Sequence, residues 1–135
     1  GVPPLYGLCK ALVAAGQQPV AALGFARAED ALLIGELKAL GARVCAATVD
    51  GSLGTKGFVT DALRESGFAY TYLYACGPEP MLRAVYGLPV SGQFSFEERM
   101  ACGFGACMGC SCKTKYGAKR ICKDGPVLQK EEIVW

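Results

Sequence analysis

Four cysteines near the C-terminus are the residues of this sequence best suited to chemistry. Cys102, Cys107, Cys110 and Cys122 have the spacing C-x4-C-x2-C-x11-C. Cysteine thiolates bind zinc and iron–sulfur clusters, and a two-iron cluster takes four of them. The first three lie in one glycine-rich loop, and glycine allows the unusual backbone angles of a chain wrapped closely around a cluster. The pattern therefore predicts that these four residues bind a metal centre.

The spacing favours a 2Fe-2S cluster over zinc. The first three cysteines reproduce the C-x4-C-x2-C run of plant-type ferredoxins. Structural zinc sites usually use two short C-x2-C pairs, and Cys122 has no such partner, so zinc is the secondary interpretation. Cys112 lies two residues after Cys110 and could replace a ligand in an extended segment, but a bystander thiol is the simpler interpretation. Cys9 and Cys45 lie on apolar faces and are expected in the core.

Five cations and no acid lie between Cys112 and Asp124. They are Lys113, Lys115, Lys119, Arg120 and Lys123. A solvated hairpin between two ligands explains them, and this is the preferred interpretation. The alternative is a docking surface for an acidic partner, because electron-transfer proteins use complementary charge to speed their encounter.

The composition excludes several classes of protein. The chain has 135 residues, 52% hydrophobic and 19% charged, with a net charge of +2 and no histidine. The apolar content excludes disorder, and the small net charge excludes a nucleic-acid-binding tract. Without histidine, serine–histidine and cysteine–histidine catalysis and histidine-ligated metals are excluded. No apolar run approaches the roughly 18 residues of a membrane span, and no signal peptide is visible, so a cytoplasmic protein is expected.

Helices and strands alternate over the first ninety residues. Helical spacing of apolar residues, proline starts and glycine ends predict helices over 4–15, 29–40, 58–66 and 80–87. Short apolar runs predict strands over 19–25, 43–48 and 69–75. This order predicts an α/β fold with a parallel sheet and right-handed crossovers. The chain enters a helix directly from Gly1-Val-Pro-Pro without a methionine, so we expect one preceding strand and a longer natural protein.

The alternating pattern breaks after residues 88–92. Five of the eight cysteines follow the break, and no long periodic segment does. We therefore expect a nucleotide-binding domain over residues 1–90 and a small cluster module over residues 91–135.

The loops after the predicted strands are the places where a parallel sheet binds ligands. Asp50 and Gly51 follow the middle strand, and a carboxylate there accepts hydrogen bonds from an adenosine ribose but repels a 2′-phosphate, which favours NAD over NADP. The spacing G-x2-G-x2-G from Gly51 is only a weak signal of a phosphate-binding loop, because it is more typical of a mobile loop. Arg27 follows the first strand and would contact a phosphate or cap the sheet edge. After the last strand comes Cys76-Gly77-Pro78-Glu-Pro-Met81, where glycine lets a ligand approach the backbone.

Several segments together resemble one family. They are Gly1-Val-Pro-Pro, Gly24-Phe-Ala-Arg-Ala-Glu-Asp30, Thr48-Val-Asp-Gly-Ser52, Gly57-Phe-Val-Thr-Asp61, Tyr74-Ala-Cys-Gly-Pro-Glu-Pro-Met81, Glu98-Arg-Met-Ala-Cys-Gly-Phe-Gly-Ala-Cys-Met-Gly-Cys110 and Cys122-Lys-Asp-Gly-Pro126. The family is the electron-transfer subunit of dihydroorotate dehydrogenase type B, in the ferredoxin–NADP reductase superfamily. The resemblance covers essentially the whole chain, and the cysteine segments are its most specific part.

The resemblance implies a place in an electron-transfer chain. It implies that Cys102, Cys107, Cys110 and Cys122 ligate a 2Fe-2S cluster. It also implies that the phosphate-binding turn of an NAD site includes Gly1 and Pro3, and that Cys76, the candidate catalytic residue, lies with Gly77 and Pro78 beside the nicotinamide. In the family, electrons pass from FMN in a separate dihydroorotate dehydrogenase subunit through the cluster to FAD, which reduces NAD in pyrimidine biosynthesis. The FAD barrel and the first strand are absent from this sequence, so weak FAD and NAD binding is expected.

Two other functions stay open at this stage. Related reductase subunits serve ferredoxin:NAD(P) oxidoreductases, sulfide dehydrogenases and hydrogenases, although Asp50 opposes the NADP members. A four-cysteine set also fits the dihydroorotate type better than relatives in which aspartate replaces one cysteine. The third possibility is a non-redox, zinc-stabilised interaction module.

Overall fold

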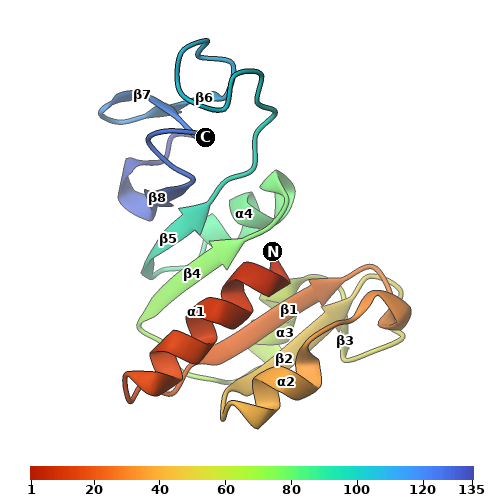
Figure 1. The fold of residues 1–135 in the computed structure, drawn as a ribbon. Coiled ribbons are helices and arrows are strands. Elements are labelled where there is room, and N and C mark those ends of the chain that lie inside the picture. The colour runs from red at the N-terminus through yellow and green to blue at the C-terminus, as the bar shows by residue number, and fades with distance from the viewer. The chain divides into compact units, whose positions relative to one another are not determined.

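The computed structural model describes all residues from Gly1 to Trp135 (Figure 1). These residues form two compact units, Gly1–Tyr70 and Thr71–Trp135. None of the helices has the length and apolar content needed to cross a membrane. The expected boundary at residue 90 between a nucleotide-binding domain and a cluster module stays a prediction.

The first unit is built around a parallel sheet. Its elements are α1 (Val2–Ala14), β1 (Val20–Phe25), the 3-10 turn η1 (Ala28–Asp30), α2 (Ile34–Ala39), β2 (Arg43–Thr48), β3 (Thr55–Lys56) and α3 (Val59–Ser66). The strands lie in the order β1-β2-β3, and both neighbouring pairs are parallel. β1 and β2 pair along their full lengths, from Val20 opposite Arg43 to Phe25 opposite Thr48. The loops after β1 and β2 therefore leave the sheet at the same edge.

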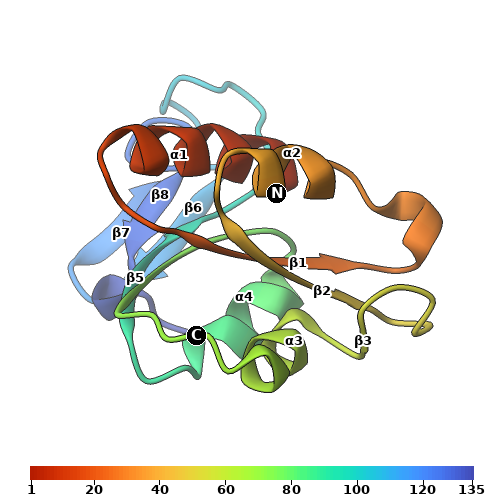
Figure 2. The same ribbon diagram turned by 90° about the horizontal axis from the view of Figure 1, so that it is seen from below.

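Helices cover both faces of this sheet (Figure 2). α1 and α2 lie on one face, where Cys9, Leu23, Leu37 and Ala42 form the buried core. α3 lies on the other face, and Val59 lies 3.6 Å from the point where a side chain of Gly24 would begin. The first unit is thus a three-layer α/β/α arrangement, as expected for strands that read as apolar runs.

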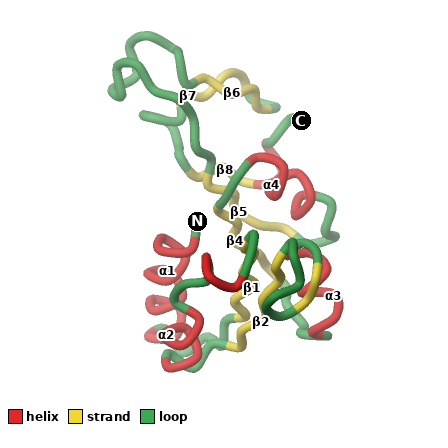
Figure 3. Tube along the Cα trace, turned by 90° about the vertical axis from the view of Figure 1, so that its right-hand side faces the viewer, coloured by secondary structure: helices red, strands yellow, loops and turns green.

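The second unit combines a mixed sheet with a hairpin. Its elements are β4 (Tyr72–Cys76), α4 (Glu79–Tyr86), β5 (Ser91–Ser95), β6 (Ser111–Thr114), β7 (Gly117–Arg120), β8 (Val127–Gln129) and the 3-10 turn η2 (Lys130–Glu132). β5 lies between β4, to which it is parallel, and β8, to which it is antiparallel. Figure 3 shows the β6-β7 hairpin at one end of this unit, together with the long loop that follows β5. Phe94 and Leu82 are fully buried in its core.

Most of the expected elements are present. The helices over 4–15, 58–66 and 80–87 correspond to α1, α3 and α4, and the strands over 19–25 and 43–48 to β1 and β2. The strand expected over 69–75 begins later, at Tyr72. The fold class, α/β with parallel strands and a following cysteine-rich segment, is confirmed.

Two expectations about the elements are wrong. The helix expected over 29–40 is interrupted, because Leu33 has a left-handed backbone with φ of 62° and α2 begins only after it. The expected strands do not form a single sheet, since β2 pairs with β1 and with the short strand β3, whereas β4 pairs with β5. β5 has the sequence Ser-Gly-Gln-Phe-Ser, which lacks the apolar run of a buried strand and was therefore not expected.

Candidate iron–sulfur site

A tightly curved loop carries the first three cysteines of the candidate site. Between Cys102 and Cys110 the backbone is left-handed at three residues, with φ of 71° at Gly103, 90° at Gly105 and 62° at Met108. Glycine adopts this conformation without steric cost, whereas Met108 does so at a cost. The loop therefore reverses direction repeatedly and keeps its cysteines close together.

The hairpin brings the fourth cysteine to the other three. Ser111 in β6 pairs with Arg120 in β7, and just beyond this pair the N–H of Ile121 donates to the carbonyl of Cys110 at 3.2 Å. The residue after Ile121 is Cys122, so the eleven residues between Cys110 and Cys122 are the β6-β7 hairpin and Ile121. A long gap in sequence thus becomes a short distance in space.

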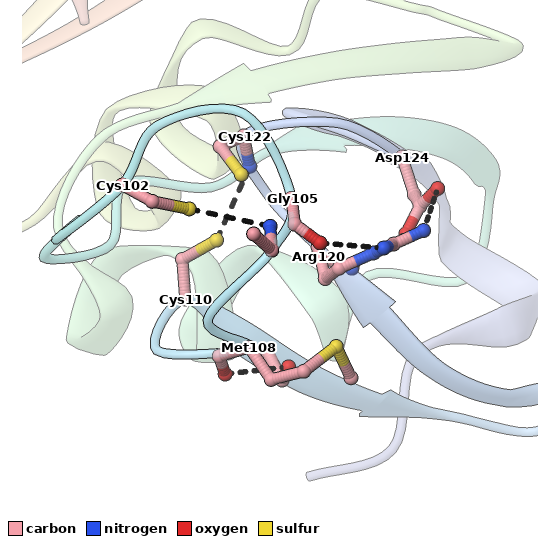
Figure 4. A network of polar contacts seen from close by, with 9 residues as sticks. Cys102, Gly105, Met108, Cys110, Arg120, Cys122 and Asp124 are labelled. Carbon is pink, nitrogen blue, oxygen red and sulfur yellow. Dashed lines mark hydrogen bonds and ion pairs between the residues drawn. The ribbon is translucent and has the colours of Figure 1, made fainter.

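Three of the four sulfurs point into one space, and three of the four accept a backbone hydrogen bond. Figure 4 shows the sulfurs of Cys102, Cys110 and Cys122 directed toward the same region. The three cysteines of the loop each accept one N–H at their sulfur: Cys102 from Ala106 at 3.3 Å, Cys107 from Gly109 at 3.3 Å and Cys110 from Cys122 at 3.4 Å. Hydrogen bonds of this kind stabilise a thiolate and tune the potential of an iron–sulfur cluster.

Backbone N–H groups around the sulfurs also change the acidity of the thiols. The pKa of Cys102 is lowered to about 6, first by the backbone N–H of Cys107 and then by that of Phe104. The pKa of Cys110 is also lowered, chiefly by the backbone N–H of Cys122. The pKa of Cys122 is raised, chiefly because its thiol is hydrogen-bonded to Cys110. Low thiol pKa values mark cysteines that give up a proton readily, as metal-binding thiols must.

These residues fit a cluster with two irons. A 2Fe-2S cluster takes four thiolates, and the site offers four cysteines, three of which accept N–H groups at sulfur. Close packing around the sulfurs is also visible at Gly109, where a side-chain carbon would lie 3.3 Å from the sulfur of Cys107.

Sequence reasoning missed a polar network behind the loop. Arg120 donates from Nη1 to the carbonyl of Gly105 at 2.7 Å and from Nε to the carboxylate of Asp124 at 2.9 Å (Figure 4). A second cation of the hairpin, Lys119, pairs with the buried Glu132 at 2.8 Å. Two of the five cations are therefore paired with acids. The signal available in the sequence was the four-residue spacing of Arg120 and Asp124 around Cys122.

The remaining thiols lie elsewhere. Cys112 lies in β6 opposite Lys119, and burial, first among several causes, raises its pKa. Cys9 is buried in the core of the first unit, and Cys45 is half-buried in β2. Burial raises the pKa of both. Burial therefore disfavours the thiolate form of all three.

Two loops of the first unit bring predicted nucleotide-binding residues together. The Asp50 carboxylate accepts from the hydroxyl of Ser52 at 2.6 Å and from its N–H at 2.9 Å, and the hydroxyl lowers the pKa of Asp50 most. The same hydroxyl accepts the N–H of Ala28 at 2.7 Å, which ties the loop after β2 to the loop after β1. Arg27, in that second loop, forms an ion pair with Glu29 at 3.2 Å.

The other residues predicted in this unit lie at turns. Gly51 has φ of 76°, and the side chain of Lys56 lies 3.1 Å from where its own would begin. Gly1 precedes α1, and Pro3 lies in the first turn of that helix, where proline is tolerated.

The remaining predicted nucleotide-binding residues lie together in the second unit. Cys76 ends β4, and Pro78 is the residue before α4. Gly77 between them lies against the end of the Met81 side chain, because a carbon added at Gly77 would lie 2.9 Å from the sulfur of Met81. The four residues thus lie around the junction between the end of β4 and the start of α4.

Comparisons with known proteins cover the segment that carries this candidate site. Residues 97–134 match the family model described as the iron-sulfur cluster binding domain of dihydroorotate dehydrogenase B. The chain is 45% identical over 139 residues to the electron transfer subunit of dihydroorotate dehydrogenase B (NAD(+)) of Geobacillus sp. (strain WCH70), covering 99% of this chain and 54% of that protein. The corresponding subunit of Lysinibacillus sphaericus (strain C3-41) is also 45% identical, with 98% of this chain and 54% of that protein covered.

A solved structure shows the same fold. It comes from a study titled "Insights into flavin-based electron bifurcation via the NADH-dependent reduced ferredoxin-NADP oxidoreductase structure". The TM-score is 0.85 at 29% identity, with 100% of this chain and 51% of the solved chain covered. The chain spans about half the length of the curated relatives it matches. It is a homologue of the C-terminal half of the electron transfer subunits of dihydroorotate dehydrogenase B, and it ends in their iron–sulfur cluster binding domain.

Proposed function

We propose that this chain is the nucleotide- and cluster-binding part of an electron-transfer subunit of dihydroorotate dehydrogenase B. The observation that carries the proposal is the cysteine loop closed by the β6-β7 hairpin, with backbone N–H groups on three sulfurs, inside the segment that matches the iron–sulfur domain. When bound, a 2Fe-2S cluster supplies one-electron transfer. Its proposed ligands are Cys102, Cys107, Cys110 and Cys122.

The proposed direction of electron flow ends at NAD. Electrons from a partner FMN-containing dihydroorotate dehydrogenase subunit would pass through the cluster site to FAD and then to NAD. The relatives are named as electron transfer subunits of an NAD(+) enzyme, which supports both the partner and the acceptor. The partner subunit and FAD belong to the complete enzyme, of which this chain spans part.

The nucleotide site is proposed on the loops at the carboxyl ends of the strands. Asp50, held by Ser52, would accept from ribose hydroxyls, and its negative charge opposes a 2′-phosphate. Arg27 and Gly51 would line the same loops, with Gly1 and Pro3 at the phosphate-binding turn. Cys76, with Gly77, Pro78 and Met81, would lie beside the nicotinamide ring.

A second function has one specific observation in its favour. The solved structure with the same fold is titled as an NADH-dependent reduced ferredoxin-NADP oxidoreductase, so a reductase subunit of that kind is the alternative. The higher identity to the dihydroorotate dehydrogenase subunits, 45% against 29%, favours the first proposal.

The first experiment is a metal analysis of the protein purified without oxygen. We expect iron and acid-labile sulfide in equal amounts and a red-brown colour that dithionite bleaches. Cys122→Ser is the matched loss variant, and Cys112→Ser is the control that removes a nearby thiol outside the proposed ligand set. Zinc without iron would overturn the proposal in favour of a non-redox interaction module. Co-purification from the host then separates the two redox functions, because a dihydroorotate dehydrogenase chain is expected and a ferredoxin-dependent partner would contradict it.

A further inference from the structure

We propose that Arg120 is a positioning residue that sets one of the backbone hydrogen bonds to the Cys102 sulfur, the one from Ala106, through the peptide between Gly105 and Ala106. The inference rests on the proposed function, because it concerns how the chain prepares its cysteines for a cluster. The hydrogen bonds of the Arg120 side chain go to Gly105 and Asp124 and not to a cysteine sulfur. Its effect would be carried by one peptide group of the cysteine loop.

The two ends of that peptide have different partners. Its carbonyl, on Gly105, accepts from Nη1 of Arg120 at 2.7 Å. Its N–H, on Ala106, donates to the sulfur of Cys102 at 3.3 Å. A trans peptide directs its C=O and N–H in opposite directions, so fixing one end aims the other. Figure 4 shows the resulting chain of contacts from Asp124 through Arg120 and Gly105 to Cys102.

Asp124 fixes the guanidinium. Its Oδ2 accepts both the backbone N–H and Nε of Arg120, each at 2.9 Å. The carbonyl of Arg120 in turn accepts the N–H groups of Lys123, Asp124 and Gly125 at 3.1, 2.7 and 3.2 Å. The Arg120 side chain is 27% exposed and that of Asp124 is 32% exposed. The pair is therefore partly shielded from water and anchored to the turn that contains Cys122.

The loop backbone is shaped for close approach at this point. Gly105 has φ of 90°, and a side-chain carbon there would lie 2.6 Å from Cδ of Lys123 and 3.4 Å from Nη1 of Arg120. The glycine thus lets the loop lie directly against the turn of the fourth cysteine. Arg120 joins the segment with three cysteines to the segment with one.

The contact also changes the strength of the N–H donor. A cation on the carbonyl polarises the peptide and strengthens the hydrogen bond made by its N–H, because hydrogen bonds in a chain reinforce one another. A reduced cluster carries one more negative charge than an oxidised one, so an N–H at sulfur stabilises the reduced form more. Arg120 should therefore raise the reduction potential of the bound cluster.

The test is a redox titration of the cluster-loaded protein and three variants. Arg120→Met should shift the potential to more negative values. Lys123→Met is the matched control, since it removes an equal charge that is exposed beside Cys122 and makes no hydrogen bond to the peptide, so its shift should be smaller. Asp124→Ala separates positioning from simple charge. Losing a negative charge alone would raise the potential, whereas releasing the guanidinium should lower it.

A spectroscopic measurement gives a second readout. In the reduced protein, electron–nuclear double resonance should show a weaker exchangeable-proton coupling in Arg120→Met than in wild type, and Arg120→Lys should restore part of it. Equal potential shifts in Arg120→Met and Lys123→Met, or an unchanged or raised potential in Asp124→Ala, would overturn the inference. That result leaves the proposed function intact if iron and sulfide are present. Zinc in place of iron would instead defeat the proposed function.

Discussion

Replacing Gly105 with alanine should destabilise the second unit more than the same change at Gly103. Both glycines have left-handed backbones, with φ of 90° and 71°, and an L-residue there costs about 1–2 kcal/mol. At Gly103 nothing lies within 4 Å of an added side-chain carbon, so backbone strain is its whole cost. At Gly105 the carbon would lie 2.6 Å from Cδ and 3.1 Å from Cβ of Lys123, so that side chain must move as well.

The difference should be measurable by unfolding in urea. The single tryptophan of the chain, Trp135, lies in the second unit, so its fluorescence reports on that unit alone. With a urea dependence of about 1–2 kcal/mol per molar for a small unit, Gly103→Ala should lower the midpoint by about 1 M. Gly105→Ala should lower it further, and it should also speed the loss of iron to a chelator. Each sample needs the same iron and sulfide content, because bound metal stabilises the folded state.

The comparison can refute the reasoning. Gly117→Ala is a further control, since Gly117 has φ of 108°, has open space around it and lies at the hairpin turn, outside the cysteine loop. If Gly105→Ala unfolded at the same urea midpoint as Gly103→Ala, the close approach of the loop to Lys123 would add nothing to the loss of unfolding free energy. If neither variant differed from wild type, the left-handed backbone of the loop would itself be wrong.

Three further predictions concern the ligand set, the acid sensitivity of α3 and the core. Cys107→Ser should lose the cluster and Cys112→Ser should keep it, as iron analysis after anaerobic purification would show. The pKa of Asp61 is lowered, first by the hydrogen bond that its carboxylate accepts from the Phe58 N–H. The ionised carboxylate therefore stabilises the fold fully above the ordinary aspartate pKa of about 3.9. This contribution is lost as the pH falls through the lowered pKa. Asp61→Asn should therefore flatten the acid limb of a stability–pH curve, and an unchanged limb would contradict this. Leu37→Ala removes a side chain that is 2% exposed and should cost about 2–5 kcal/mol, measured by circular dichroism during unfolding.

The elements of the first unit were predictable because their signals are local. β1 and β2 read as short apolar runs, and α1 has apolar residues at helical spacing with proline in its first turn. The interruption before α2 was not predictable, because Leu33 is apolar and fits the helical pattern, yet its backbone is left-handed. Residue type alone carries almost no signal for such a conformation outside glycine and asparagine.

The arrangement of the strands depended on long-range pairing. β5 is a polar, glycine-containing segment that becomes a strand because β4 and β8 flank it on both sides. Its two buried residues are Gly92 and Phe94, and Phe94 is fully enclosed in the structure. Strand propensity reflects the surroundings of a segment as much as its residues, so a strand of this kind is recognised only once its neighbours are known.

For the cysteine site, too, the sequence predicts the features that depend on neighbouring residues and misses those that depend on distant contacts. The residue type and spacing of the four cysteines are enough to propose them as ligands, because thiolates bind metals and three of the four cysteines lie within nine residues. The residues around the sulfurs were less visible. The sequence predicts Arg120 as one of five solvated cations, yet its guanidinium donates to the carbonyl of a residue fifteen positions earlier. Arginine is common on surfaces, and only the fold shows that its donors meet the loop.

The position of Arg120 explains why the long gap before the fourth cysteine carries a hairpin. A two-stranded hairpin fixes register, so pairing Ser111 with Arg120 places Arg120 at the base of the hairpin, directly before the turn of Cys122. A flexible connection of equal length would let Cys122 reach a cluster but would not hold an arginine against the carbonyl of Gly105. Shifting the register by one residue, for example by inserting a glycine after Tyr116, should therefore retain iron while lowering the reduction potential as Arg120→Met does. An insertion variant with a wild-type potential would show that the hairpin is only a spacer.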